Sequence, residues 1–361
     1  MPSINSGFWK NKKVFITGHT GFKGSWLSLW LVKLGAKVTG YALNPPTSPS
    51  LFKLLRLKND ISSIMGDVRN LRFIKAEMKK AGPDIVIHMA AQPIVRESYK
   101  LPVETYGTNI MGTVNVLESV RGCGSVKVFL NVTTDKVYEN KELGKSFKES
   151  EPLGGYDPYS SSKACSEIVT SAYRSSFFNP ILYRVHGVAV STARAGNVIG
   201  GGDWAPDRLI PNFFRAVLSG KNILIRNPSA TRPWQHVLDP LNGYLTLIEA
   251  MYNNGSRYSG AWNFGPFKND AKSVKWVIDN ICKKWGGGVE YYVVNNVQPH
   301  ESEFLKLNCS KSQKLLKWYP KWNINEAILK VVEGIKAYEA GVDERELCER
   351  QIKEYASWKM V

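Results

Sequence analysis

At 361 residues the chain exceeds one ordinary domain, and its 43% hydrophobic content is enough for a large core without disulfides. With 22% charged residues it does not have the composition of a disordered chain, and it contains no run of 18 apolar residues that would predict a membrane span. The net charge of +17 is spread along the chain without a dense basic stripe, which disfavours nucleic-acid binding and leaves surface charge or attraction of a phosphorylated ligand.

The cysteines and the N-terminal segment bear on the cellular compartment. The five cysteines are scattered, without a CxxC pair or the Cys/His spacing of a metal site, so we expect reduced thiols and no metal. The first residues lack the apolar core of a signal peptide. A cytoplasmic protein is therefore expected.

Strands and helices alternate through the first half of the chain. Residues 13–17 have the pattern of a buried strand. Residues 22–34 have apolar residues at helical spacing, and Gly35 is placed to end this helix. Further strands are predicted at 36–42, 61–65, 84–89, 126–132 and 187–192, and further helices at 70–81, 103–121 and 158–178. This alternation is typical of an α/β fold with a parallel sheet covered on both faces.

The alternation stops near residue 197, where glycine, proline, arginine and tryptophan become frequent. A helix and a strand within 237–262 indicate a return to the sheet, and an amphipathic helix near 324–339 precedes a charged tail. We predict a sheet domain over residues 1–193 with returns near 237–264 and 308–335. A smaller mixed α/β domain would comprise residues 194–236, 265–307 and 336–361.

A glycine-rich turn joins the first strand to the first helix. Gly18, Gly21 and Gly24 allow a tight turn and a close approach of the backbone to a pyrophosphate at the helix N-terminus. The placement predicts a Rossmann-type, doubly wound dinucleotide-binding domain, although a plain turn is the alternative. The predicted cofactor contacts from this turn are Gly18, His19, Thr20, Gly21, Phe22, Lys23 and Gly24, with a solvated side chain as the alternative for His19.

Two further positions bear on the cofactor. Asp67, after the third strand, is placed either to bind an adenine amino group or to cap the helix that begins near Asn70. The second strand ends at Asn44 without an Asp or Glu for a ribose hydroxyl and without an Arg for a 2′-phosphate. We prefer NAD over NADP.

Tyr159 and Lys163 are one helical turn apart on the same helix face. An ammonium beside a phenol lowers the phenol's pKa from about 10, so Tyr159 is a candidate base, although a surface pair is the alternative. Thr134, at the end of the predicted strand 126–132, would lie in the ligand crevice. The order of the glycine turn, Thr134 and the Tyr–Lys pair predicts oxidation of a substrate alcohol.

These motifs carry a resemblance over nearly the whole chain. Together with residues 88–92, 108–113, 194–200 and 232–237, the chain resembles extended short-chain dehydrogenases/reductases that act on nucleotide-sugars. The segments GHTGFKGSWL, TTDKVYEN, RAGNVIGGGDW and RPWQHVLDP most resemble the 4,6-dehydratases among them. The resemblance implies CDP-glucose as the small-molecule partner, bound NAD as the cofactor, and a hydro-lyase reaction in deoxysugar and O-antigen biosynthesis.

The resemblance also implies roles for individual residues. Tyr159 would take the proton of the sugar 4-hydroxyl, and Asp135 would protonate the departing C6 hydroxyl. Related dehydratases commonly have Glu where this chain has Lys136, which is either the C5 base, a group that stabilises the enolate, or a solvated side chain. Additional cofactor contacts would be Val68, Ala90, Ala91, Gln92, Asn109, Tyr159 and Lys163. Substrate contacts would be Thr134, Asn197, Arg208, Arg232, His300 and Glu301, whereas Arg194 at a strand end is expected to be structural.

The resemblance also implies a homodimer, or a dimer of dimers, through the helices near 103–121 and 156–178, unless their apolar faces only cover the sheet. Two other functions stay open. A nucleotide-sugar 4-epimerase would need neither Asp135 nor Lys136. A regulatory protein that senses dinucleotides without catalysis would not need the Tyr–Lys pair.

Overall fold

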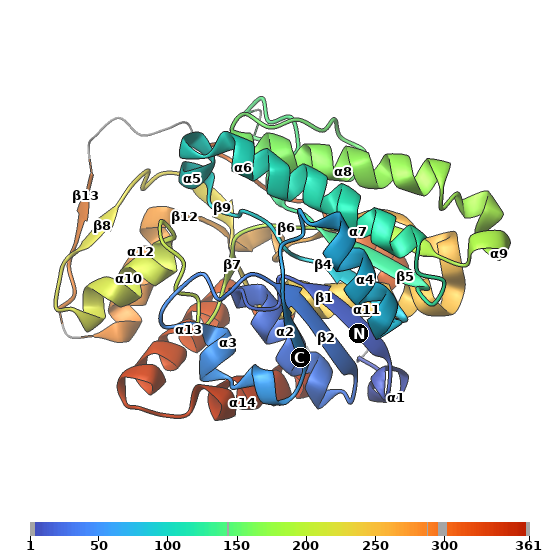
Figure 1. Ribbon diagram of the computed structural model, residues 1–361. Helices are drawn as coiled ribbons and strands as arrows, with labels where there is room; N and C mark the ends of the chain where they lie inside the picture. The colour runs from blue at the N-terminus through green and yellow to red at the C-terminus, as the bar shows by residue number, and fades with distance from the viewer. Residues whose placement is uncertain (1–3, 143, 287, 295–301, 359–361) are drawn as a thin grey trace.

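A seven-stranded parallel sheet forms the centre of the computed structural model, which describes residues 4–142, 144–286, 288–294 and 302–358 (Figure 1). Its strands are β1 (Lys13–Thr17), β2 (Lys37–Ala42), β3 (Ser62–Met65), β4 (Ile85–His88), β5 (Val128–Val132), β6 (Ala189–Ala195) and β11 (Gly260–Phe264). They lie in the order β11-β6-β5-β4-β1-β2-β3, and every neighbouring pair is parallel. The order reverses between β1 and β4, where ligands bind in sheets of this kind. The predicted Rossmann-type fold is confirmed.

Helices cover both faces of the sheet (Figure 1). One face is covered by α2 (Phe22–Lys33), α11 (Leu238–Asn254) and α14 (Glu344–Ser357), and the other by α4 (Leu71–Ala81), α7 (Gly112–Arg121) and α8 (Pro158–Ser176). Neighbouring strand residues alternate between these layers: Ile16 is in the core with α2, and Phe15 is in the core with α4 and α7. The shorter helices are α1 (Ser6–Trp9), α3 (Leu51–Leu54), α5 (Val95–Lys100), α6 (Pro102–Tyr106) and α9 (Tyr183–His186). Among the described helices, none has both the length and the hydrophobicity needed to cross a bilayer.

The predicted helix at 103–121 is interrupted. Between α6 and α7, residues Gly107–Met111 form a π-helical turn. Asn109 in this turn donates a hydrogen bond to the carbonyl of Gln92, and Gly112 passes so close to Val68 that an added Cβ would lie 2.8 Å from Cγ2 of Val68. A π turn inserts a residue locally and often occurs at functional sites. Periodicity alone did not predict this interruption because both flanking helices keep the same spacing.

The smaller domain lies at the left of Figure 1 and has its own core. Its helices are α10 (Leu209–Leu218), α12 (Val274–Trp285) and α13 (Ile324–Glu339). The sequence analysis grouped α13 with the sheet domain, as part of the return at 308–335, but its apolar face is buried in this second core. Three strand pairs accompany them: β8 (Ile223–Ile225) with β13 (Tyr291–Val293), β9 (Thr231–Pro233) with β12 (Ala271–Ser273), and β7 (Val198–Ile199) with β10 (Gln235–His236). Phe213, Ile278 and Ile328 are fully buried in its core.

The segment predicted as a charged tail is the helix α14. Its Cys348, Ile352 and Tyr355 are buried in the same core as α2, although the sequence analysis grouped residues 336–361 with the smaller domain. Its Arg345 forms an ion pair with Asp60 at 2.6 Å and donates to the Leu55 carbonyl, so a charged residue also fixes the helix to the sheet domain. A helix with few apolar positions can therefore belong to the main core when those few share one face.

Candidate active site

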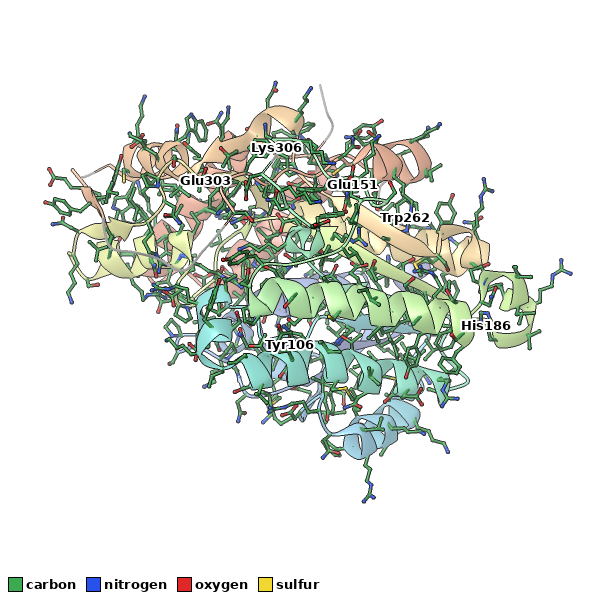
Figure 2. All side chains as sticks on the ribbon, turned by 90° about the horizontal axis from the view of Figure 1, so that it is seen from above. Tyr106, Glu151, His186, Trp262, Glu303 and Lys306 are labelled. Carbon is green, nitrogen blue, oxygen red and sulfur yellow. The ribbon has the colours of Figure 1, made fainter. Side chains whose placement is uncertain are left out.

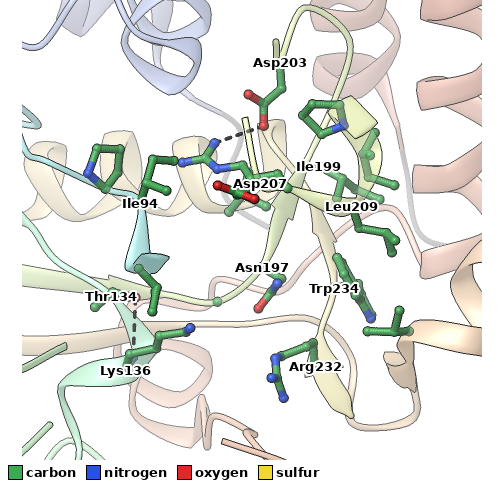
Figure 3. Close-up of a pocket in the computed structure, with 18 of the residues that line it drawn as sticks. Ile94, Thr134, Lys136, Asn197, Ile199, Asp203, Asp207, Leu209, Arg232 and Trp234 are labelled. Carbon is green, nitrogen blue, oxygen red and sulfur yellow. Dashed lines mark hydrogen bonds and ion pairs between the residues drawn. The ribbon is translucent and has the colours of Figure 1, made fainter. Parts of the chain in front are cut away.

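Two adjoining hollows lie at the carboxyl edge of the sheet. The first hollow is lined by the glycine turn, the residues after β2, β3 and β4, and Tyr159 and Lys163 of α8. The second hollow is lined by residues 133–136 after β5 and by residues of the smaller domain (Figure 3). Lys23, Tyr159 and Arg208 are among the residues that line both, so these side chains lie where the hollows meet.

The glycine turn is shaped by its own packing. Gly18 has φ +78°, and a Cβ added there would lie 2.8 Å from the backbone nitrogen of Ala90. A Cβ at Gly24 would overlap the carbonyl oxygen of Gly18, whereas one at Gly21 would lie 3.5 Å from that oxygen. Gly21 is the N-cap of α2 and offers no side-chain cap, so the first backbone N–H groups of the helix face the hollow. The turn therefore fits a dinucleotide pyrophosphate.

His19 does not face either hollow. It is fully buried, its Nε2 lies 2.7 Å from Oγ of Ser63, and its ring packs edge-on against Phe52. Burial lowers the pKa of His19 to about 4. Both predictions for this side chain are corrected, because it is turned into the protein beneath β2 and is neither solvated nor directed at a cofactor phosphate.

Asp67 lines the first hollow and is fixed by Arg69. The ion pair between Arg69 Nη2 and Asp67 Oδ2 is 2.6 Å long, and this hydrogen bonding lowers the pKa of Asp67. The helix-cap alternative is wrong, because Asn70 caps α4 by accepting a bond from the Phe73 N–H. Contact of Asp67 with an adenine stays a prediction.

Other predicted cofactor contacts divide into two groups. Val68, Ala90 and Ala91 line the first hollow. Gln92 and Asn109 do not: Asn109 donates to the Gln92 carbonyl at 3.1 Å and to Oγ of Ser162 at 2.8 Å. The Asn109 side chain thus ties the loop after β4 to α8, and the Gln92 side chain bonds Thr105 of α6, which corrects their predicted role as direct contacts.

The end of β2 carries no group for a 2′-phosphate. Asn44 lines the first hollow there, beside Leu43, Pro46 and Thr47. The cations among the described lining residues are Lys23, Lys163 and Arg208, and none of them follows β2. This arrangement fits NAD better than NADP.

Tyr159 and Lys163 begin α8, whose N-cap Asp157 accepts a hydrogen bond from the Ser160 N–H at 2.9 Å. Lys163 Nζ donates to the Val132 carbonyl at 2.9 Å, and burial together with the nearby charge of Lys23 lowers the pKa of Lys163 to about 8. Loss of hydration raises the pKa of Tyr159 to about 12, and its hydrogen bond with Thr134 opposes this only in part. The predicted lowering of the Tyr159 pKa is therefore wrong for the protein alone, because desolvation outweighs neighbouring positive charge.

Three consecutive residues after β5 face the second hollow. Thr134 donates to Oδ1 of Asp135 at 3.1 Å, and burial raises the pKa of Asp135 to about 6. The side chain of Lys136 extends into the hollow toward Asn197 (Figure 3), so it faces the site, and its role there stays a prediction. Gly196 leaves room for this cluster, since an added Cβ would lie 2.9 Å from Oδ2 of Asp135.

Comparisons with known proteins match this geometry. The sequence pattern of the GDP-mannose 4,6 dehydratase family matches residues 15–331. The chain belongs to this family. A curated CDP-glucose 4,6-dehydratase of Salmonella typhimurium is 49% identical over 98% of this chain and 99% of its own length.

Solved structures share the fold. A dTDP-glucose 4,6-dehydratase of Bacillus anthracis in complex with NAD has a TM-score of 0.73 at 23% identity, covering 93% of this chain and 99% of that one. A UDP-glucose 4-epimerase of Thermotoga maritima has a TM-score of 0.75 at 20% identity, covering 90% and 99%. Dehydratases and epimerases thus share this fold, and side chains must separate the two reactions.

Most of the predicted substrate residues of this dehydratase-family chain meet at the second hollow. Asn197, Arg208 and Arg232 line it. Arg208 forms an ion pair with buried Asp203 at 3.0 Å (Figure 3), and Arg232 donates to the Thr231 carbonyl at 3.1 Å. His300 and Glu301 lie outside the described residues.

Arg194 is structural, as expected. Its guanidinium forms an ion pair with Glu167 at 2.9 Å, both side chains are buried, and it lies over the ring of Tyr138. Glu167 also accepts a hydrogen bond from Thr133 at 2.5 Å. This network holds the end of β5 against α8 directly behind the site.

The sequence analysis missed four charged residues among those that line the second hollow: Arg96, Asp203, Asp207 and Arg226. They come from three separate segments, so no spacing in the sequence joins them. The one local signal is the Asp–Arg dipeptide at 207–208 within an irregular glycine-rich region.

Proposed function

We propose that the chain is an NAD-dependent CDP-glucose 4,6-dehydratase that forms CDP-4-dehydro-6-deoxyglucose and water. The observation that carries the proposal is the placement of Asp135 and Lys136 opposite the substrate residues, beside the Tyr159–Lys163 pair. The 49% identity to a curated CDP-glucose 4,6-dehydratase supports the choice of nucleotide.

The first hollow would hold NAD. The backbone of Gly21 and the N-terminus of α2 would bind the pyrophosphate, Asp67 the adenine end, and Lys163 the nicotinamide ribose. When bound, NAD supplies a hydride acceptor for C4 and returns the hydride to C6. The wall of Val68, Ala90 and Ala91 would exclude water from the adenine side.

Tyr159 would accept the proton of the sugar 4-hydroxyl, and Thr134 would hold the same oxygen. A phenol with a pKa of about 12 is protonated at neutral pH, so it must first lose its proton. Lys163, with a pKa of about 8, is one turn away, and in its neutral form it would take the phenolic proton of Tyr159.

Dehydration needs an acid and a base beyond the Tyr–Lys pair. Asp135 is a suitable acid for the C6 hydroxyl because a carboxyl with a pKa of about 6 remains partly protonated near neutral pH. Lys136 would remove the C5 proton or stabilise the enolate from the same side of the hollow. An epimerase has no use for either group.

The discriminating experiment is product analysis by NMR after incubation with CDP-, dTDP-, UDP- and GDP-glucose, with and without added NAD⁺. We expect a 4-keto-6-deoxy product from CDP-glucose, formed faster than from the other three. Recovery of only a C4 epimer would contradict dehydration. Preference for another nucleotide would contradict the choice of CDP alone.

We also propose a homodimer through α6, α7 and α8. These helices lie side by side, joined by a 2.8 Å hydrogen bond between Tyr106 and Ser161 (Figure 2). Val103 of α6, Ile168 of α8 and Met111 of the π turn between α6 and α7 are exposed although they are apolar, with Val103 at 85%. Sedimentation should give twice the chain mass, and Ile168→Glu should give a monomer; a wild-type monomer would contradict the proposal.

A further inference from the structure

Two arginines from different domains meet one carboxylate at the second hollow. Arg96 belongs to α5, beside the sheet, and Arg226 directly follows β8 of the smaller domain. Asp207 lies between them, and its Oδ1 is 3.5 Å from Nη1 of Arg96 and 3.3 Å from Nη1 of Arg226. All three residues line the hollow that also contains Asn197 and Arg232.

This cluster is poorly suited to stabilising the fold. The three side chains are 36%, 34% and 24% exposed for Arg96, Asp207 and Arg226, and ion pairs with such exposure contribute little because water and salt screen them. Asp207 also has φ +57°, which is unfavourable for a residue other than glycine. Backbone strain without a gain in stability is typical of functional sites.

The charges of the cluster are those of an anion site. Two guanidinium groups near each other repel unless an anion lies between them, and Asp207 provides a single negative charge through one oxygen. A diphosphate carries more charge and several oxygens, and arginine binds such groups with paired hydrogen bonds.

We propose that Arg96 and Arg226 form a clamp across the two domains for the diphosphate of the nucleotide-sugar, and that Asp207 occupies the place of that diphosphate until the substrate binds. The inference rests on the proposed function only in taking a nucleotide-sugar as the ligand. The clamp adds to Asn197, Arg208 and Arg232, and it joins the sheet domain to the smaller domain when the substrate is present.

Asp207 and the two arginines should affect the affinity for a diphosphate in opposite directions. Removing the charge of Asp207 removes a competitor and should tighten diphosphate binding, whereas removing either arginine should weaken it. If the cluster were only a structural link between domains, all three changes would break the link and would shift binding in the same direction.

The test is calorimetric titration of the NAD-loaded protein with CDP and, separately, with cytidine. We expect Arg96→Gln and Arg226→Gln to weaken CDP binding about tenfold, which corresponds to about 1.4 kcal/mol. Asp207→Asn should tighten CDP binding several-fold. Cytidine, which has no diphosphate, should bind all variants alike. Arg56→Gln is the matched control, because Arg56 forms a similar exposed ion pair with Asp343 at 2.6 Å but lines neither hollow.

Weaker CDP binding by Asp207→Asn, or unchanged binding by both arginine variants, would overturn the clamp. A thermal denaturation curve for each variant verifies that it is folded. If the wild type binds UDP, dTDP or GDP in place of CDP, the same series is run with that nucleotide. If the arginine variants then weaken binding of that nucleotide and Asp207→Asn tightens it, the clamp is supported although CDP-glucose is not the substrate. Failure of the clamp and failure of the proposed substrate therefore give different results.

Discussion

The two hollows are lined by different kinds of chain. The first hollow is built mainly from backbone: a glycine turn, the N-terminus of α2, and the small residues after β4. The second hollow is lined by polar and charged side chains, among them Thr134, Asp135, Lys136, Asn197, Arg208, Arg226 and Arg232. Backbone N–H groups are fixed by the fold, whereas arginines and lysines act through charge. One protein can therefore recognise two phosphate-containing ligands by two physical means, backbone hydrogen bonds and side-chain charge. Because salt screens charges, added salt should weaken substrate binding more than cofactor binding.

The largest expected effect comes from a residue that the two hollows share. Tyr159→Phe removes the phenolic oxygen and should lower turnover of the nucleotide-sugar by a factor on the order of 10²–10⁴, because general base catalysis is lost. Both ligands should still bind, since the ring remains in place. Product formation is followed by NMR and ligand binding by calorimetry; a variant that keeps more than about a tenth of the activity would refute the role of Tyr159 as base.

The wall behind both hollows depends on a buried ion pair. Glu167→Gln leaves Arg194 buried without its counter-charge, and we expect the free energy of unfolding to fall by about 3–5 kcal/mol. Urea denaturation measures this loss. As a control, Asp279→Asn breaks the exposed pair between Asp279 and Lys275 and should leave stability almost unchanged. Equal losses in the two variants would contradict the distinction.

The backbone character of the first hollow can be tested through its glycines. Gly24→Ala forces a Cβ against the Gly18 carbonyl, so the turn must move, at a cost of about 1–3 kcal/mol. We expect NAD⁺ affinity to fall about a hundredfold and CDP affinity to stay near that of the wild type. Gly21→Ala is the comparison, because its Cβ would lie at an ordinary contact distance of 3.5 Å from the Gly18 carbonyl oxygen. Any loss of NAD⁺ affinity in this variant would come from the methyl group meeting the ligand, without a distorted turn. An equal loss of CDP binding would show that the hollows are not independent.

A smaller effect is the pH dependence of stability that two buried histidines should cause, one in each part of the molecule. His88 ends β4, while His236 lies edge-on against Trp26 and Trp322 beneath the smaller domain. Burial lowers the pKa of each to about 3, from an ordinary value of 6.5. The folded state therefore binds fewer protons than the unfolded state, so stability is fully present above pH 6.5 and is lost as the pH falls toward 3.

Each histidine should contribute a slope of about 1.4 kcal/mol per pH unit within that window. Urea titrations at pH 7, 6 and 5 measure the slope. His236→Gln should reduce it and leave the contribution of His88. A slope that His236→Gln does not change would show that His236 does not titrate between the folded and unfolded states.

Most of the first hollow could be predicted from sequence, because the turn, the strand ends and the Tyr–Lys pair depend on local spacing. The exceptions are side-chain directions: His19 lies in the turn but is buried beneath β2, and Asn109 binds the Gln92 backbone. No local pattern distinguishes a side chain that faces a ligand from one that faces the core. The partners that decide this, such as Ser63 for His19, lie far along the chain.

The sequence by itself determined the parallel sheet, the dinucleotide turn and the chemical types of the site residues, because hydrophobic periodicity and glycine geometry act over short distances along the chain. Only the tertiary structure decided the protonation of the site and the Arg96–Asp207–Arg226 cluster. A pKa depends on how much water burial removes, and a clamp depends on segments that meet after folding. Both are properties of the folded chain and have no counterpart in the local sequence.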